Sequence, residues 1–332
     1  MASKLFRSQF EVDGENQSHR EACCIGDVSA GFSMPGWECC MKELVARIDA
    51  AACEALRQEV DLEYKPGLVC PGNNGSHADM NCTTFYRSIA ALQGYFGNCF
   101  AAGIEGAEFR TLQAHGLAAE KAMFKATDGV NTHKGAIFLM GLLAGAAGAQ
   151  FREHGCFDPI SLGRLVAAKW GVNILLAGVQ DQVQHSDSPT HGRRVKDAFG
   201  LPGAREQAAD GFPVLFWTTV PQLRWALSEG LSQEQAQLHA LVCTIGKLPD
   251  TNLAHRGGLK GLQWAQGRVD QFLAEGGVFA SGWKSRAQHL CAQFELQWLS
   301  PGGSADLLSA ALFVQALVQV NCELPNFMVA RS

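Results

Sequence analysis

The chain has 332 residues, of which 47% are hydrophobic and 18% are charged, enough to bury the core of one large domain or two smaller ones. A net charge of −5 argues against a broad basic surface, so nucleic acid is not an expected partner and an anionic ligand must meet a few local cations or a metal ion. The 12 cysteines include no Cys-x-x-Cys pair, which favours reduced thiols over a zinc site.

The first regular pattern begins at Trp37. Residues 1–36 show little periodicity and are expected to form an irregular N-terminal extension. Residues 37–332 contain no series of alternating strands and are expected to form one all-helical domain. Apolar residues recur at helical spacing after Trp37 and predict an amphipathic helix that ends near Leu62.

A polar loop separates this helix from the next. Pro66 stops the first helix, and the loop PGNNGSHADM follows at residues 71–80. Thr83 or Thr84 is then expected to cap a second helix, and a third helix is expected over residues 105–125. The inner face of the second helix is expected to carry Phe85, Ile89, Leu92 and Phe96.

A second polar loop, DGVNTHKG at residues 128–135, precedes an apolar run that ends at Gln150. Asn131 or Thr132 is expected to cap the helix that starts there. The run is shorter than the roughly 20 residues that cross a bilayer and contains glycines at near-helical spacing. We therefore expect a buried helix in a soluble cytoplasmic protein without a membrane partner, followed by another helix over 160–178.

The second half alternates irregular and helical patterns. Residues 182–213 are rich in Gly, Pro, Ser and His and are expected to be irregular. Ser232 and Gln235 predict a capping box at the start of a helix. The stretch DTNLAHRGGLKG at 250–261 is a third polar, glycine-bearing segment, and in SPGGSADLL Ser304 is expected to cap the last helix after a Gly-Gly turn.

These polar segments share one arrangement, a Gly- or Asn-rich turn followed by a capping side chain and a helix. The free N–H groups and the positive dipole end of a helix start suit phosphate, and glycine lets the backbone approach an anion closely. The chain has neither a P-loop motif nor a dinucleotide-binding glycine fingerprint. Because most capped helix starts bind nothing, the pattern alone leaves both a polyphosphate site and a purely structural role open.

Two of the acidic residues in or near these segments have two interpretations each. Asp306 either favours the dipole of a first helical turn or acts on a substrate, and Asp79 either forms an Asx turn or binds Mg²⁺. Asp250 is a candidate turn cap, and Glu59 has the position of a solvated surface acid. The loop histidines lie beside Gly, Asn or Ser, which favours a functional role over a core position: His77, His133, His191 and His255.

Taken in order, six segments resemble the motifs of the triphosphoribosyl-dephospho-coenzyme A synthases. The segments are EVDLEYKPGLVCPGNNGSHADMN, GVNTHKGAIF, THG, GAREQAADGFP, DTNLAHRGG and SPGGSADLL, and the match runs from about Leu44 to about Val318. The family makes the prosthetic-group precursor for the acyl carrier subunits of citrate lyase and malonate decarboxylase. The resemblance implies an all-helical catalytic domain over residues 37–332, with the active site formed by its Gly/Asn-rich interhelical loops.

The implied reaction joins the ribose C1 of ATP to the 2′-hydroxyl of 3′-dephospho-coenzyme A and releases adenine. Both nucleotides are then substrates, Mg²⁺ is the expected cofactor, and a separate transferase is the partner that receives the product. A homodimer is compatible with this reading. Positive charge develops at the ribose when its bond to adenine breaks, so a nearby carboxylate stabilises the transition state.

The resemblance also implies site residues. The catalytic candidates are Glu59, His77, Asp79, His133, Asp250 and Asp306. The substrate-binding candidates are Lys65, Asn73, Asn74, Asn131, Lys134, Arg205, Arg256 and Ser304. The cations among them are expected to hold phosphates, Asp79 and Asp306 to bind Mg²⁺, and His77 or His133 to act as acid or base.

One position departs from the family pattern. Gln207 stands where a glutamate is expected, with Glu206 one place earlier, and together with DTNLAHRGG this favours the malonate decarboxylase branch over the citrate lyase branch. One rival interpretation is a Mg²⁺-dependent hydrolase of an N-glycosidic or ADP-ribosyl bond, which would favour paired aspartates that this chain lacks. Another is a non-catalytic helical protein that binds coenzyme A derivatives, against which the charged residues in every loop argue.

Overall fold

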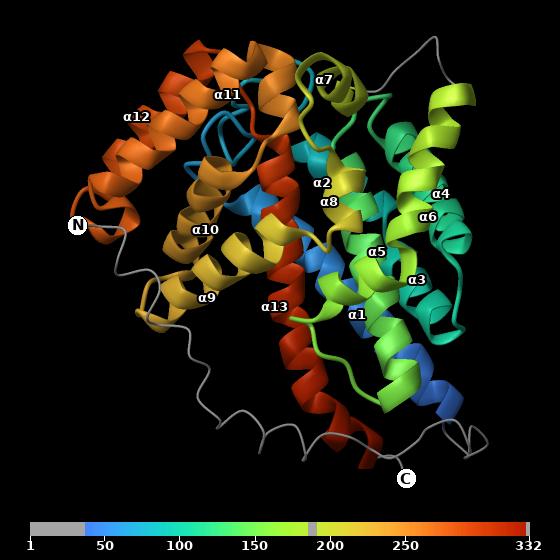
Figure 1. The fold of residues 1–332 in the computed structure, drawn as a ribbon. Helices are drawn as coiled ribbons and strands as arrows, with labels where there is room; N and C mark the ends of the chain where they lie inside the picture. The colour runs from blue at the N-terminus through green and yellow to red at the C-terminus, as the bar shows by residue number, and fades with distance from the viewer. Residues whose placement is uncertain (1–36, 185–190, 330–332) are drawn as a thin grey trace, which may run out of the picture.

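The structure is a computed structural model that describes residues 37–184 and 191–329 (Figure 1). Within these ranges every regular element is a helix, and the only extended pairing is an isolated bridge between Cys70 and Asn73. The helices are α1 (Trp37–Asp61), α2 (Cys82–Ala91), α3 (Tyr95–Ile104), α4 (Phe109–Ala126), α5 (Lys134–His154), α6 (Leu162–Gln184), α7 (His191–Phe199), α8 (Ala204–Ala209), η3 (Leu215–Thr219), α9 (Val220–Ser228), α10 (Gln233–Lys247), α11 (Thr251–Ala274), η4 (Gly277–Phe279), α12 (Trp283–Leu296) and α13 (Gly302–Val329). The prediction of a single all-helical domain is confirmed. The extension expected over residues 1–36 lies outside the described residues.

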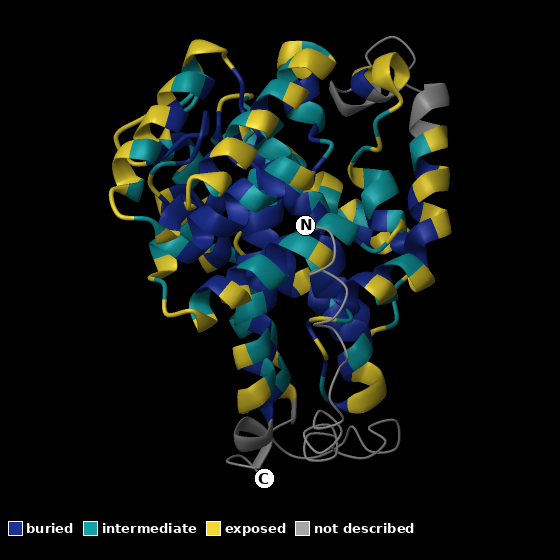
Figure 2. Ribbon diagram, turned by 60° about the vertical axis from the view of Figure 1, so that its left-hand side comes forward, coloured by how far each residue is buried: buried dark blue, intermediate teal, exposed yellow. Residues whose placement is uncertain are grey.

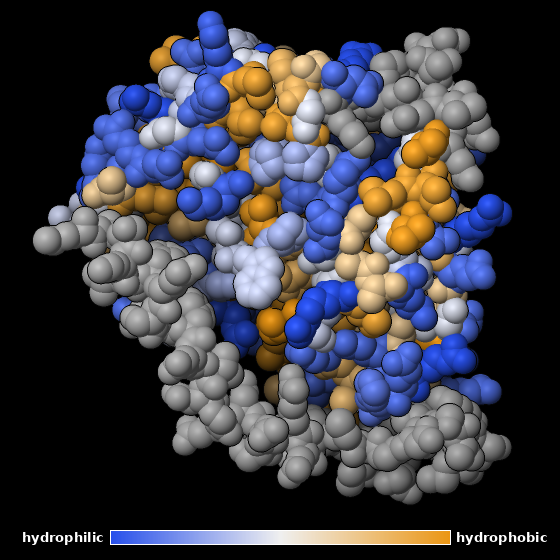
Figure 3. All heavy atoms as spheres, in the orientation of Figure 1, coloured by the Kyte–Doolittle hydropathy of each residue, from blue (hydrophilic) through white to orange (hydrophobic). Residues whose placement is uncertain are grey.

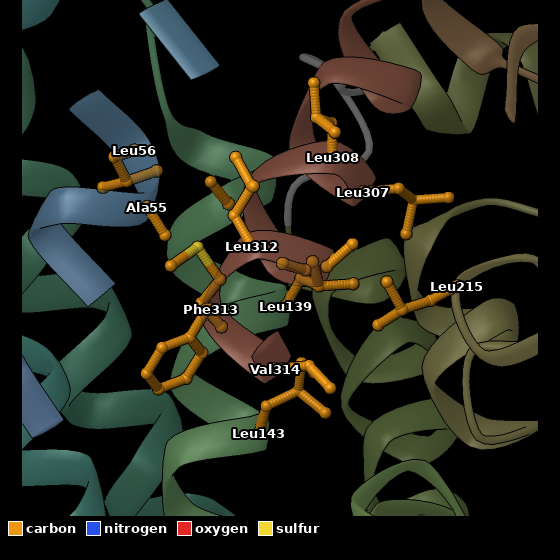
Figure 4. Close-up of a cluster of buried hydrophobic side chains, with 14 of the residues drawn as sticks. Ala55, Leu56, Leu139, Leu143, Leu215, Leu307, Leu308, Leu312, Phe313 and Val314 are labelled. Carbon is orange, nitrogen blue, oxygen red and sulfur yellow. The ribbon is translucent and has the colours of Figure 1, made fainter. Parts of the chain in front are cut away.

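The centre of the molecule is α13, which runs through the core and packs against α1, α5 and α10 (Figures 1 and 2). Its sequence is apolar nearly all round, as expected of a helix enclosed by others. Figure 4 shows how its side chains meet those of α1 and α5 in one continuous cluster. The labelled members of this cluster are Ala55, Leu56, Leu139, Leu143, Leu215, Leu307, Leu308, Leu312, Phe313 and Val314.

Helices α3 and α5 approach each other closely because glycines line their contact. A Cβ at Gly103 would lie 2.1 Å from the carbonyl oxygen of Gly145, and one at Gly148 would lie 2.0 Å from that of Phe100. Neither position accepts a side chain without moving a backbone. The expected buried helix after the second polar loop is therefore confirmed, and its glycines have a packing role.

Three helices of the described residues, α5, α6 and α13, are long and apolar enough to cross a membrane by length and composition alone. In the fold their most apolar windows are 78%, 39% and 61% buried, so α5 and α13 are mostly enclosed by other helices. Helix α6 keeps much of its apolar surface exposed. The predicted absence of a membrane partner stays a prediction.

Most predicted helices exist, but several of their starts were misplaced. The α1 helix is confirmed, whereas α2 is capped by Asn81 and not by Thr83 or Thr84. The segment expected as one inner face is broken after Ala91, where α2 ends. Gly94, with a φ of 87°, is the N-cap of α3, so that Phe96 belongs to α3. The N-cap position of α5 is His133, although Asn131 accepts a hydrogen bond from the Lys134 N–H at 3.2 Å. Helix α4 starts later than predicted.

The second half holds more helix than the sequence indicates. The Ser232 capping box is confirmed. Two helices, α7 and α8, lie within the segment predicted to be irregular, and its residues 185–190 are outside the described chain. The segment 250–261 is the start of α11, with a kink at Gly258, whose φ is 62°. Helix α13 begins at Gly302, so the prediction that Ser304 caps it was wrong.

Candidate active site

A buried ion pair closes the end of α1. Lys65 is 2% exposed, and its Nζ lies 2.7 Å from Glu59 Oε1 and donates to the Glu59 carbonyl as well. The chain can return to its own helix because Tyr64 adopts a left-handed φ of 60°. Glu59 is therefore buried, and the expectation of a solvated surface acid was wrong. An isolated charge would be costly to bury, so each member of the pair requires the other.

Asp250 joins the starts of two helices. Its Oδ1 accepts from the Asn252 and Leu253 N–H groups at the start of α11, at 2.9 and 3.4 Å. Its Oδ2 accepts from both the N–H and the hydroxyl of Ser304 in α13, each at 2.9 Å. Asp250 is thus a helix cap, as its predicted capping role implied, and burial raises the pKa of its carboxyl group. Ser304 positions Asp250.

Asp306 lies in the second turn of α13 with its carboxyl group against the first turn of α5. A Cβ at Gly135 would lie 2.0 Å from Asp306 Oδ2, and the Ala136 N–H donates to the carboxyl group. Burial raises its pKa well above the ordinary value, and the charges of Glu59 and Asp250 raise it further. Three acids from α1, α11 and α13 therefore form one cluster, which we call the acid cluster.

His133 borders the acid cluster and is neutral. Its Nδ1 lies 2.7 Å from Ser88 Oγ, and its ring stands edge-on to Phe85. Its Nε2 is buried and has no hydrogen-bond partner among the described residues. Burial and the charge of Lys65 lower the pKa of His133 to about 3, so the imidazole stays uncharged at neutral pH.

His77 and Arg256 form a second group at the surface. The Arg256 guanidinium donates to the carbonyls of Ser76 and Trp298, at 2.6 and 3.1 Å, and its Nη2 lies 3.1 Å from His77 Nδ1. The other ring nitrogen of His77 is 2.8 Å from the hydroxyl of Ser300. Burial and the Arg256 charge lower the pKa of His77 to about 4. We call these residues, with the neighbouring loop 71–80, the arginine rim.

The two groups meet where the chain enters α13. Ser300, which contacts His77, lies four residues before Ser304, which contacts Asp250. Arg256 itself lies one and a half turns along the helix that Asp250 caps. The predicted residues of the first, second, fifth and sixth motifs thus converge at one end of the fold, near the starts of α5, α11 and α13.

The remaining predicted residues lie at the edges of this region or elsewhere. Lys134 pairs with Glu120 of α4 at 2.9 Å, and its backbone begins α5. Asn73 and Asn74 are exposed in the first loop, where Asn73 Nδ2 donates to Glu295 at 2.7 Å. Arg205 is on α8 beside Gly178 of α6, where a Cβ would lie 3.0 Å from its Nη1.

Three neighbours of the site were not predicted. Ser88 lies among the apolar positions of α2, and a lone hydroxyl on an inner helix face is a signal that could have found it. Glu120 and Trp298 carry no sequence signal, because each contacts the site through a residue of another helix that is distant in the chain.

The acidic side chains of the site can bind Mg²⁺ only together with phosphates of the substrate. No group of three or more His, Cys, Asp or Glu side chains in residues 37–184 and 191–329 is arranged to hold a metal ion. Asp250 has both carboxylate oxygens occupied, and Glu59 is paired with Lys65. Asp79 extends from the arginine rim with its side chain 65% exposed. Since Mg²⁺ usually binds one or two carboxylates together with substrate phosphates, a pre-built protein cage is not required.

Similarity to known proteins identifies the class. A family model described as CitG, ATP:dephospho-CoA triphosphoribosyl transferase, matches residues 45–323. A relative from Acinetobacter calcoaceticus is 37% identical over 271 residues, which cover 81% of this chain and 90% of the relative. Relatives from Vibrio cholerae serotype O1 (strain M66-2) and Citrobacter koseri are each 36% identical, over 81% of this chain and 87% and 90% of their own length. No solved structure matches the chain.

The chain belongs to the CitG family of transferases. All three relatives carry the name "Probable 2-(5''-triphosphoribosyl)-3'-dephosphocoenzyme-A synthase". The chain is accordingly a triphosphoribosyl-dephospho-CoA synthase, which makes its product from ATP and dephospho-CoA. The resemblance of the six motifs is thereby confirmed at the level of the family, and the hydrolase and non-catalytic alternatives are set aside.

Proposed function

We propose that the acid cluster is where the ribose of ATP reacts. The observation that carries this proposal is the position of Asp306, whose carboxyl group meets the start of α5 while Glu59 and Asp250 raise its pKa. Groups with strongly shifted pKa values at the meeting point of helix starts are typical of catalytic sites. The start of α5 adds partial positive charge that favours the triphosphate, whereas Asp250 already caps the starts of α11 and α13.

The reaction needs a proton donor at the leaving adenine and a proton acceptor at the attacking hydroxyl. The bond between ribose C1 and adenine breaks with its electron pair going to adenine, while the 2′-hydroxyl of dephospho-CoA forms the new bond to C1 and loses its proton. Asp306, whose raised pKa favours its protonated form, supplies the proton that adenine takes. The Glu59 carboxylate does not touch the substrate, because it is buried and paired with Lys65, but its charge acts through space, as it does on Asp306, and stabilises the positive charge on the ribose.

His133 is the base that this arrangement favours. Its Nε2 has no hydrogen-bond partner among the described residues, so with the proton on Nδ1 this nitrogen can accept the hydroxyl proton. Both ring nitrogens of His77 are engaged, by Arg256 and Ser300. His77 therefore positions Arg256 within the arginine rim. The two histidines, between which the sequence left the choice open, have different roles in this proposal.

The phosphates are met by residues at the surface of the region. Lys134 and Arg256, with Arg205 on α8, supply cations for them, and the amides of Asn73, Asn74 and Asn131 supply hydrogen bonds. Lys65 is excluded from this role by its burial and its pairing with Glu59. Asp79 would be the protein ligand of a Mg²⁺ ion bound to the triphosphate, and the ion would neutralise phosphate charge. An Asp79→Asn variant is then expected to need more Mg²⁺ for half-maximal activity, and to bind Mg·ATP more weakly in calorimetry.

Adenine release tests the catalytic roles. The protein is incubated with ATP, Mg²⁺ and dephospho-CoA, and free adenine is measured over time. Asp306→Asn and Lys134→Ala are each expected to abolish turnover while thermal unfolding stays nearly unchanged. An active Asp306→Asn variant would overturn the proton-donor assignment. An equally large loss of stability would assign either residue to the fold instead.

Two residues of α8 support a proposal about the metabolic pathway that this enzyme serves. Glu206 caps α8 by accepting from the Gly203 N–H at 2.9 Å, so its carboxylate is engaged locally. Gln207 keeps the position of the expected glutamate, and its buried Oε1 has no partner among the described residues. This departure, with DTNLAHRGG, supports the malonate decarboxylase branch. Disruption of the gene is then expected to abolish growth on malonate and to leave growth on citrate intact; the reverse pattern assigns it to citrate lyase.

The proposed location is the cytoplasm, and the proposed assembly is a homodimer through α6. Its exposed apolar side chains Val172, Leu175, Leu176 and Val179 form a stripe, which gives the apolar patch over α6 in Figure 3. Steps of three and four residues are the spacing by which two like helices pair along a seam. Light scattering is expected to give the mass of two chains, and Leu176→Glu to give one. A monomeric wild-type protein would end this proposal.

A further inference from the structure

Trp298 occupies a backbone position that suits glycine. Helix α12 ends in a Schellman motif, in which Leu299 N–H donates to the Phe294 carbonyl and Trp298 N–H to that of Glu295. Trp298 is the residue in the left-handed conformation, with a φ of 54°. A bulky side chain is strained at such an angle, and glycine is the usual occupant. The motif therefore gives no structural reason for a tryptophan.

The indole is not part of the core. Trp298 is 61% exposed, and no aromatic ring of the described residues packs against it. The hydrophobic contact of the Schellman motif is made instead by Phe294 and Leu299, which are both buried. A strained residue whose side chain remains in solvent points to a use outside the fold.

Trp298 belongs to the arginine rim. Its carbonyl oxygen accepts from Arg256 Nη1 at 3.1 Å, and the same guanidinium contacts His77, which in turn contacts Ser300. The Arg256 guanidinium thus holds the backbone from which the exposed indole extends, at the surface end of the chain of contacts that leads to the acid cluster. An exposed aromatic ring beside an arginine is the combination that binds a nucleobase and its phosphate together.

We propose that Trp298 is the platform on which the adenine of dephospho-CoA stacks, with Arg256 facing the diphosphate of the same molecule. This assignment rests on the proposed acid cluster. The adenine of ATP must lie inside that cluster, because its ribose bond breaks there. The adenine of the acceptor is retained in the product and is carried by the same ribose as the attacking hydroxyl, which suits a surface beside the reacting centre.

Steady-state kinetics with both substrates varied test the platform. Trp298→Ala is expected to raise KM for dephospho-CoA about 10-fold or more, since base stacking contributes about that much per base, and to change KM for ATP less than about two-fold. Trp298→Phe, which keeps an aromatic face, is expected to retain most of the affinity. Trp217→Ala is the matched control, because Trp217 is 82% exposed on η3 and contacts none of the site residues described above.

Trp298→Gly separates binding from folding. Glycine fits the φ of 54°, so the melting temperature is expected to rise while KM for dephospho-CoA rises as in Trp298→Ala. Unchanged KM values in both variants would overturn the platform, and a rise in KM for ATP alone would overturn the assignment to the acceptor. If Asp306→Asn stays active while Trp298→Ala still weakens dephospho-CoA binding, the platform holds and the catalytic role of the acid cluster fails.

Discussion

The contact between Gly135 and Asp306 allows a test of whether the reaction depends on the position of the Asp306 carboxyl group. In a Gly135→Ala variant the new Cβ would lie 2.0 Å from Asp306 Oδ2, whereas ordinary contact begins at 3.4 Å. The carboxyl group must therefore move by at least about 1.4 Å, and a misplacement of about 1 Å costs roughly 100-fold in rate. We expect kcat/KM to fall about 100-fold, or about 2.7 kcal/mol of transition-state stabilisation.

The same substitution is expected to leave stability almost unchanged. Alanine favours a helix over glycine by roughly 0.5–1 kcal/mol, and the lost hydrogen bond from the Ala136 N–H costs about as much. Adenine release and urea unfolding are measured on the same preparation. Gly267→Ala is the control, since a Cβ at this position of α11 meets nothing within 4 Å. A Gly135→Ala enzyme with wild-type kcat/KM would refute the need for Asp306 at its observed position.

Other contacts give predictions of stability. Lys65→Met leaves the Glu59 charge buried alone and is expected to destabilise the fold by about 3–5 kcal/mol. The Lys65→Met/Glu59→Gln double variant is expected to recover much of this stability. If it recovers none, the ion pair does not have the role described. Asp250→Ala removes two helix caps and leaves the Ser304 hydroxyl unpaired, for an expected loss of about 2–4 kcal/mol in urea unfolding, and a loss under 1 kcal/mol would contradict the bridge. His133 has a folded pKa of about 3, below its unfolded value, so its contribution is present above pH 6.5 and is lost as pH falls. Wild type should lose about 2 kcal/mol more than His133→Asn between pH 7.5 and 5, and identical pH profiles would refute the shift.

The helices were predictable because their apolar residues recur at helical spacing over many turns, as α1 shows. The errors fall where one residue decides the outcome. Asn81 competes with two threonines as a cap, and Gly94 breaks a face that looks continuous. The segment around α7 and α8 was misjudged because its composition resembles a loop, while its contacts with α6 and α11 stabilise helix.

The site was predictable as a set of motifs but not as a set of contacts. Glycine, asparagine and charge in the loops mark the residues, whereas their partners depend on where distant helices begin. Asp250 and Ser304 are 54 positions apart and share two hydrogen bonds. Glu59 was expected at the surface, since nothing local indicates that Lys65 turns back to cover it. The role of Trp298 was not predictable, because the sequence does not show that this tryptophan adopts a left-handed φ, which is usual for glycine.

The position of α13 has a consequence for synthesis of the chain. The apolar face of α1 is completed by α13, which starts about 240 residues later. At roughly 5–20 residues per second, a ribosome needs on the order of 12–50 s to supply that partner, during which the face of α1 lacks its final cover. Nascent chains are therefore exposed to aggregation until α13 has been translated, and overproduction should benefit from holding chaperones or slow induction at low temperature.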